Sequence, residues 1–404
     1  MLHRKELQNG MRIVLEEIQT VRSVTIGIWI KTGSRNERNS ENGISHFIEH
    51  MLFKGTTNYT PQQIAEAFDA VGGEINAFTS KEYTCFYAKV LDTHKDMAME
   101  ILADMLLHSV FDEEEIEREK QVVLEEINMT EDTPDDIIHD HLAAVAYQEH
   151  PLAKPILGSK ESVHRLEQSQ LFQYVKDHYT ADHIVVSVVG NVDASFMDKV
   201  EQTLQVETTS NSLQEEQLPT FHAGYIQGQK ETEQAHLCLG FEGVSISDKD
   251  IYPMLIVNNV LGGNMSSRLF QEIREKSGLA YAIYSYHSAF IDSGMLTIYA
   301  GTSENQLKHV QDKIYTIIHQ LRTQGISKKE WSNSKEQLKG LHILSLESMN
   351  SKMSRNARNE LLQREHPSLD EIMNRIDQVQ LEDVERLLNG LQIEQAAQAM
   401  ITPK

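Results

Sequence analysis

Cysteine is almost absent from this chain, which carries only Cys85 and Cys238 among 404 residues. The two lie in strand-like runs in different halves of the sequence, so we predict free, buried thiols rather than a disulfide. The sequence also contains no Cys-x-x-Cys pair. A disulfide-stapled scaffold and a cysteine-rich zinc site are therefore both excluded.

Long hydrophobic runs are missing as well. The most apolar stretches, residues 24–30 and 184–189, have the length of strands, whereas a membrane-spanning helix needs about 20 apolar residues. The first seven residues have neither the apolar core of a secretion signal nor the Arg- and Ser-rich, acid-poor composition of a transit peptide. We therefore predict a cytoplasmic protein with no membrane partner.

Basic residues are few relative to acidic ones. The 37 Lys and Arg residues stand against 60 Asp and Glu, which gives a formal net charge of -23. This sign disfavours nucleic acid and anionic membranes as partners. An acidic binding chamber would favour cationic peptides, but a charged surface for solubility explains the same composition equally well.

The sequence contains one large internal repeat. Strand-like segments at 11–17, 23–32, 74–79, 83–91 and 183–189 alternate with helix-like ones. The pattern starts again with a strand at 235–241, a helix at 250–261, strands near 280–285 and 294–300, and then long helices to the end. A polar, aperiodic stretch separates the halves. We predict a catalytic domain at 1–205, a linker at 206–219 and a repeat domain at 220–404.

Chemistry is indicated by the pentapeptide His46-Phe47-Ile48-Glu49-His50. On a helix, residues three and four apart are neighbours, so both histidines can hold one metal ion with Glu49 beside them. The apolar residues around the motif fall on the other side of the helix, toward a core. With 18 histidines in the chain, such a string arises by chance in roughly one chain in fifteen. The motif therefore needs a third ligand.

The third ligand is predicted on an acidic helix that begins at Asp112 and runs to about residue 130. Glu119 and Glu126 fall within its apolar stripe, whereas Glu125 falls on the opposite side. A buried carboxylate is costly unless it is paired or bound to a metal. We predict that Glu126 is the ligand and that Glu119 orients a ligating histidine, and that the other glutamates of this helix are solvated.

These residues resemble a known family. The HxxEH string, followed 76 residues after its second histidine by Glu126 in the segment 119–126, is similar to the pitrilysin/insulinase (inverzincin) metallopeptidases, and most of all to their bacterial two-domain, processing-peptidase-like members. The resemblance covers nearly the whole chain. It implies an α+β fold of two homologous α/β-sandwich domains, each a mostly antiparallel sheet packed with helices, and one Zn²⁺ per chain.

The resemblance also implies a substrate site. The segment 72–79 resembles the family's edge strand beside the active centre, where Asn76 and Ala77 would hold substrate backbone. In the second half, Phe270, Arg274 and Tyr281 match residues that reach toward bound substrate. Without the resemblance, Arg274 would be interpreted as a surface charge and Tyr281 as a core aromatic.

The internal repeat predicts that only the first half binds metal. The motif helices are aligned by the glycines that follow them, and the acidic helix is aligned by matching Ile116 with Trp331. Every ligand position of the first half then has a different residue in the second half. The paired positions are His46 with Met254, Glu49 with Val257, His50 with Asn258, Glu119 with Ser334 and Glu126 with Leu341. The second half then serves structure and substrate binding.

The sequence thus predicts a zinc-dependent endopeptidase that hydrolyses peptides or unfolded polypeptides in an enclosed chamber, with metal-activated water and Glu49 as general base. By resemblance the chamber needs four repeats, which predicts a homodimer in which Arg274 and Tyr281 of one copy face the zinc of the other. Three alternatives stay open: a catalytically silent peptide-binding or scaffold subunit, a dedicated precursor-processing peptidase, and a metal hydrolase acting on small amides.

Overall fold

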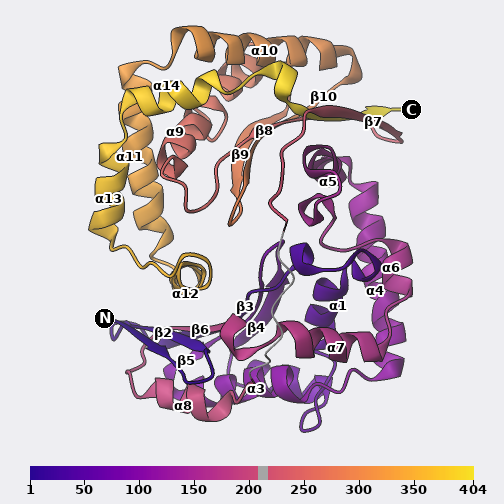
Figure 1. Cartoon of the computed structure of the whole chain (residues 1–404), viewed down its shortest axis with the longest axis vertical. Coiled ribbons are helices and arrows are strands. Elements are labelled where there is room, and N and C mark those ends of the chain that lie inside the picture. Colours follow the sequence, from indigo (N-terminus) through magenta and orange to yellow (C-terminus); the bar gives the residue numbers. More distant parts are fainter. Residues whose placement is uncertain (208–216) are drawn as a thin grey trace. The chain divides into compact units, whose positions relative to one another are not determined.

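A computed structural model describes residues 1–207 and 217–404 of the chain (Figure 1). They form two compact units, each assembled from separate stretches of sequence. Unit 1 contains Met1–Asn128, the described residues from Lys154 to 207, and Ser345–His366; unit 2 contains Met129–Ala153, Gln217–Leu344 and Pro367–Lys404. Most of the predicted linker, residues 208–216, lies outside the described residues. The predicted division into 1–205 and 220–404 stays a prediction.

Unit 1 is built on a six-stranded sheet with the order β1-β2-β6-β3-β5-β4. Only the β2–β6 pairing is parallel, and the others are antiparallel. The strands are β1 (Leu2–Glu6), β2 (Arg12–Glu17), β3 (Ser23–Ile30), β4 (Glu74–Thr79), β5 (Thr84–Leu91) and β6 (Ile184–Gly190). The central strands β3 and β6 are buried on both faces, which is why their sequences are apolar almost throughout.

Helices cover this sheet. One face packs on α1, α2, α3, α4, α7 and α8, whose buried residues share one hydrophobic core with alternate residues of β3, β5 and β6. The helices of the first half are α1 (Ile44–Met51), α2 (Pro61–Asp69), α3 (Lys95–His108), α4 (Glu113–Asp132), α5 (Pro134–Tyr147), α6 (Lys160–His164), α7 (Gln168–His178) and α8 (Phe196–Thr203). The predicted helix at 112–130 is confirmed by α4.

Unit 2 contains a five-stranded sheet with the order β7-β11-β8-β10-β9. Its strands are β7 (Gly224–Lys230), β8 (Ala235–Glu242), β9 (Ala282–Ala289), β10 (Gly294–Thr302) and β11 (Ala397–Pro403). The helices of the second half are α9 (Ile251–Leu261), α10 (Leu307–Gln324), α11 (Lys328–Ser345), α12 (Met349–Arg358), α13 (Leu369–Gln378) and α14 (Leu381–Asn389). The segment 270–275 forms a short π-helix.

The two sheets confirm the internal repeat. Reading β2-β6-β3-β5-β4 against β7-β11-β8-β10-β9 matches every neighbour, and the one parallel pair, β2–β6 or β7–β11, falls at the same place in both. The prediction that helices run to the end of the chain is wrong, because β11 follows the last helix. Its sequence, Ala-Gln-Ala-Met-Ile-Thr-Pro, is short and only partly apolar, and it becomes a strand by pairing with β7 and β8.

Each unit takes one helix from the other half of the sequence. Helix α12 packs on the second face of the unit 1 sheet, where its Met353 and Ala357, with Leu361 of the following π-helical turn, join Trp29 in a separate core. Helix α5, coloured purple in Figure 1, packs on the equivalent face of the unit 2 sheet through Ile138, Leu142 and Ala146. A glycine of the central strand lies under each helix: Gly27 under Met353 and Gly240 under Leu142.

Two predictions made from what the sequence lacks can be compared with the structure. Cys85 and Cys238 are free and buried, as predicted. Within the described residues, no helix combines the length and the apolarity that crossing a bilayer requires.

Candidate metal centre

The motif helix α1 presents one apolar face and one functional face. Ile44, Phe47, Ile48 and Met51 are at most 1% exposed and pack into the core of unit 1, as predicted. The imidazoles of His46 and His50 lie on the other side, with their ring centroids 4.6 Å apart. Burial of the apolar face therefore fixes the direction in which both histidines point.

Helix α4 brings the carboxylates to this face. Its first turn is capped by Asp112, whose Oδ1 accepts the backbone N–H groups of Glu114 (2.9 Å) and Glu115 (3.1 Å). Two turns apart on the buried side lie Glu119, with 5% of its side chain exposed, and Glu126, with 38% exposed. Glu125 is exposed. The helical spacing predicted from the sequence is therefore the one observed.

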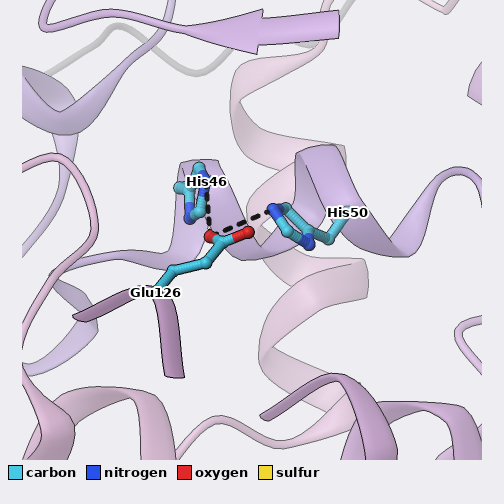
Figure 2. A group of neighbouring side chains, drawn as sticks. All are labelled: His46, His50 and Glu126. Atoms are coloured by element: carbon cyan, nitrogen blue, oxygen red, sulfur yellow. Dashed lines mark ion pairs between the residues drawn. The ribbon is translucent and has the colours of Figure 1, made fainter. Parts of the chain in front are cut away.

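His46, His50 and Glu126 converge on one point (Figure 2). Glu126 Oε2 lies 3.6 Å from Nε2 of His46 and 3.6 Å from Nε2 of His50. Ligands bound at about 2.1 Å to a tetrahedral ion are about 3.4 Å apart, so these spacings fit a zinc ion. Two imidazoles and one carboxylate are also a donor set used by catalytic zinc. Among the described residues this is the one such group of three.

The two histidines have different electrostatic surroundings. Burial, and then the neighbouring His50, lower the pKa of His46 to about 3, so this imidazole is neutral and keeps a lone pair for a metal. His50 Nδ1 lies 2.8 Å from Glu119 Oε1, and because a carboxylate only accepts, Nδ1 carries a proton and Nε2 is the nitrogen that faces Glu126. Burial would lower the pKa of His50, but this bond and the nearby carboxylates outweigh it and raise the pKa.

Glu49 of α1 lies beside the cluster and contacts Thr79, the last residue of the edge strand β4. Its Oε2 accepts a hydrogen bond of 2.6 Å from the Thr79 hydroxyl. Burial raises the pKa of Glu49, while the Thr79 bond acts in the opposite direction. Among the described strands, β4 pairs only with β5, through Asn76 with Tyr87 and Ala77 with Phe86. The structure thus places the predicted base and the predicted substrate strand next to the histidines.

Two residues of this site were missed by the sequence reasoning. Lys54 Nζ lies 2.6 Å from Glu119 Oε2, and with the His50 bond it lowers the pKa of Glu119 against the opposing effect of burial. Thr79 is the second. Both lie close to predicted elements. Lys54 follows the motif helix, and Thr79 ends the predicted strand segment 72–79. Their side-chain partners are distant in sequence, so no local pattern identifies them.

The predicted C-terminal residues form a cluster of their own in unit 2. The Arg274 guanidinium carbon lies 5.0 Å from the centre of the Phe270 ring and 4.9 Å from that of Tyr281. Such distances allow cation–π attraction. Tyr281 precedes β9 and is 76% exposed, so it is not a core aromatic. An exposed aromatic held by an arginine is available for contact with a ligand.

The structure corrects the alignment of the repeat by one residue. Ser334 donates to Asn259 Oδ1 (3.0 Å), as Glu119 binds His50, and Ser285 donates to Asn258 Oδ1 (2.7 Å), as Thr79 binds Glu49. The matched positions are therefore His46 with Leu255, Glu49 with Asn258 and His50 with Asn259. Met254 and Val257 are core residues. The prediction that the second half lacks the ligands holds in either register.

The chain matches two domain families in order along its length. Residues 12–160 match the domain described as insulinase (peptidase family M16), and residues 165–338 match the peptidase M16 inactive domain. The first match contains all three residues of the metal cluster. The second lies mostly in the half that has lost the ligand positions.

Full-length relatives and solved structures agree with these matches. The uncharacterized zinc protease YmxG of Bacillus subtilis is 53% identical over 100% of this chain and 98% of its own length. A zinc protease of Streptomyces coelicolor is 40% identical over 95% of this chain and 85% of its own length. A protease from Helicobacter pylori has the same fold, with a TM-score of 0.94 at 22% identity over 100% of this chain and 99% of its own. The chain belongs to the insulinase family of peptidases, M16.

Proposed function

We propose that this protein is a zinc-dependent endopeptidase. The observation that carries the proposal is the convergence of His46, His50 and Glu126 at zinc-ligand spacing, with Glu49 beside them in a chain of the M16 family. We assign zinc to these three residues, one ion per chain. Zinc is favoured over manganese or cobalt by the donor set, although these ions often substitute in such sites.

Each residue of the centre has a proposed role. When bound, zinc supplies Lewis-acid chemistry, which acidifies water and polarises a carbonyl. Glu49 accepts the proton of the water that attacks the peptide carbonyl and returns it to the leaving amine. The Thr79 hydroxyl orients Glu49, and Glu119 fixes the His50 ring with Nε2 directed to the cluster.

We further propose that substrate binds extended along the edge of β4 that does not pair with β5. The backbone N–H of Ala77 donates to the Asn76 side chain (2.8 Å), and we propose that a peptide carbonyl takes the place of that side chain when substrate binds. Backbone bonding of this kind gives affinity without demanding one sequence. Peptides and unfolded polypeptides of varied sequence are therefore the proposed substrates.

The C-terminal cluster suggests how the site is completed. Phe270, Arg274 and Tyr281 are proposed to contact substrate, with Arg274 and Tyr281 assisting catalysis and the Tyr281 hydroxyl donating to the developing oxyanion. We propose that the protein is a homodimer in which Arg274 and Tyr281 of one copy face the zinc site of the other. A paralogous partner chain could supply the same two residues. A cytoplasmic location and turnover inside a closed chamber remain part of this proposal.

The test compares two adjacent glutamates. Purified wild-type protein should contain zinc and cut a quenched fluorogenic peptide library. Glu126→Gln should lose most of both, because a carboxamide is a poor zinc ligand. Glu125→Gln changes the neighbouring, exposed side chain in the same way and should match wild type.

Three outcomes would redirect the assignment. Wild-type protein that binds zinc but cuts no peptide would favour a silent peptide-binding subunit. Cleavage of one precursor sequence alone would favour a dedicated processing peptidase. Equal zinc loss in Glu125→Gln and Glu126→Gln would refute the assigned ligand set.

Glu119 provides a graded prediction. In Glu119→Gln the bond to His50 can persist through the amide oxygen, but the negative charge that strengthens it and pairs with Lys54 is lost. We expect zinc affinity, measured by competition with a chelator, to fall about 10- to 100-fold. Glu117→Gln, on an exposed position of the same helix, is the control and should bind zinc as tightly as wild type.

A further inference from the structure

A buried carboxylate lies under the start of the motif helix. Glu37 belongs to the segment 31–43 that connects β3 to α1, and only 4% of it is exposed. Its Oε1 accepts the backbone N–H of Ser45 (2.9 Å), and its Oε2 accepts the backbone N–H of Gly43 (2.8 Å). Glu37 therefore caps α1 from seven residues away from the helix start.

Helix α1 depends on such a cap. The first N–H groups of any helix lack partners within the helix, and a helix of eight residues is too short to be stable by itself. The N-cap position is Gly43, at φ 95°, and no side chain at this position caps the helix. The negative charge of a carboxylate at this end also interacts favourably with the helix dipole.

Helices are usually capped by a side chain at the N-cap position. At Gly43, close packing leaves no room for a side chain. A Cβ on Gly43 would lie 2.6 Å from the Leu157 carbonyl oxygen and 2.9 Å from Gly158 Cα. Its positive φ disfavours other residues as well. The capping group must therefore come from a residue other than the N-cap, and Glu37 supplies it.

Glu37 is itself held in place. Asn42 Nδ2 donates both to Glu37 Oε2 (2.9 Å) and to the Pro155 carbonyl (3.1 Å), and the Ser162 hydroxyl donates to the Asn42 carbonyl (2.6 Å). Beside the cap, the Tyr174 hydroxyl lies 2.8 Å from Ser45 Oγ and 3.0 Å from Thr32 Oγ1. The start of α1 is thus joined to three other segments of unit 1.

We propose that Glu37 is a positioning residue for the metal centre, holding the first turn of α1 so that His46 stays at ligand distance from His50 and Glu126. His46 directly follows Ser45, whose N–H Glu37 binds. Fraying of this turn would move His46, whereas His50 in the second turn is held separately by Glu119. This inference rests on the proposed zinc site.

The charge and shape of Glu37 both matter. Burial raises its pKa, and its hydrogen-bond donors act in the opposite direction. Glutamine keeps the shape but has one accepting oxygen, so its NH₂ group would face another donor, either the Ser45 N–H or the Gly43 N–H and the Asn42 amide. Glu37→Gln therefore leaves at least one of these donors without its partner.

The experiment measures metal binding in the full-length protein. Compared with wild type, Glu37→Gln should bind zinc about tenfold or more weakly in chelator competition and should show an altered visible spectrum after loading with Co²⁺, whose absorption depends on ligand geometry. With zinc in excess, kcat should fall about tenfold, while KM changes by less than about twofold. Glu37→Asp, shorter but still charged, should be intermediate and serves if the glutamine variant does not fold.

The matched control is Glu360→Gln. Glu360 is an equally buried carboxylate of unit 1, bound to Arg4 (2.8 Å) and His366 (2.7 Å). It precedes Leu361, which belongs to the core on the sheet face opposite α1. This variant should lower thermal stability without changing zinc affinity or the Co²⁺ spectrum. Folded Glu37 variants that match wild type in both readouts overturn the proposal. Zinc-loaded wild type that cuts no peptide contradicts the proposed function only, since the affinities can still be compared.

Discussion

Substituting Glu49 by glutamine is expected to lower the rate of peptide cleavage by about 10²- to 10⁴-fold and to leave the zinc content unchanged. Glu49 does not belong to the cluster of His46, His50 and Glu126, so its loss removes no predicted ligand. Glutamine is isosteric and can still accept the Thr79 hydroxyl, which preserves packing. What it loses is the ability to take up a proton.

The measurement is single-turnover cleavage of a fluorogenic peptide, with zinc determined on the same samples. A general base acts in the transition state, so kcat and kcat/KM should fall together while KM stays near its wild-type value. Thr79→Val is a milder variant for comparison, because it removes only the hydrogen bond to Glu49. It should lower the cleavage rate far less than Glu49→Gln does. A Glu49→Gln protein that cuts at the wild-type rate would rule out Glu49 as the base.

The convergence of His46, His50 and Glu126 could be predicted from the sequence because much of its geometry is local to two helices. In α1 the spacing of His46 and His50 places both on one face, and in α4 the seven-residue spacing of Glu119 and Glu126 does the same. The burial of the apolar faces confirms both patterns. The apolar-side position of Glu119 and Glu126 suggests joining the two helices, and the family resemblance supports it, since periodicity alone does not say which helices meet.

The supporting contacts could not be predicted in the same way. Thr79 contacts Glu49, Lys54 contacts Glu119 and Glu37 contacts the first turn of α1. In each case the partners are separated in sequence or lie in different elements. A buried glutamate in a loop has no periodic signature, because its partners are backbone N–H groups brought near by folding. The residues that orient a site are thus harder to find than its ligands.

The sheets show a second limit of sequence reasoning. Strands β3 and β5 are apolar and were predicted within two residues of their observed bounds. Strands β1, β7 and β11 were not, since each has polar or exposed positions and is stabilised by its neighbour in the sheet. The exchange of α5 and α12 was also missed, because an amphipathic helix does not encode which sheet it will cover.

Because α12 packs in unit 1, Met353→Asp in this helix should strongly destabilise unit 1, although the residue belongs to the C-terminal half of the sequence. Met353 is 1% exposed, its Sδ accepts the Trp29 indole N–H (3.1 Å), and its backbone carbonyl accepts the Ser187 hydroxyl (2.9 Å). Aspartate would leave a cavity and an unpaired buried charge, with a cost of about 5 kcal/mol or more. This is a large part of the roughly 5–15 kcal/mol that stabilises a typical domain.

Thermal unfolding followed by tryptophan fluorescence tests this, because Trp29 is 1% exposed and lies against α12. We expect the unfolding midpoint of unit 1 to fall by about 10–20 °C. Zinc should be released in the same transition, because the motif helix α1 packs on the opposite face of the same sheet. Arg358→Asp introduces the same carboxylate at an exposed position of α12 and should shift the midpoint little. Equal shifts in the two variants would contradict the packing described for α12.

Leu142→Asp is the corresponding variant in unit 2 and should destabilise that unit. Leu142 is fully buried on α5, against the sheet that contains Cys238 and Met295, so unit 2 should lose stability through a residue of the N-terminal half. If both variants behave this way, neither sequence half can fold completely without the other. The same reasoning predicts that two chains covering 1–205 and 220–404 yield zinc-binding protein only when they are produced together, because only then does α12 cover Trp29.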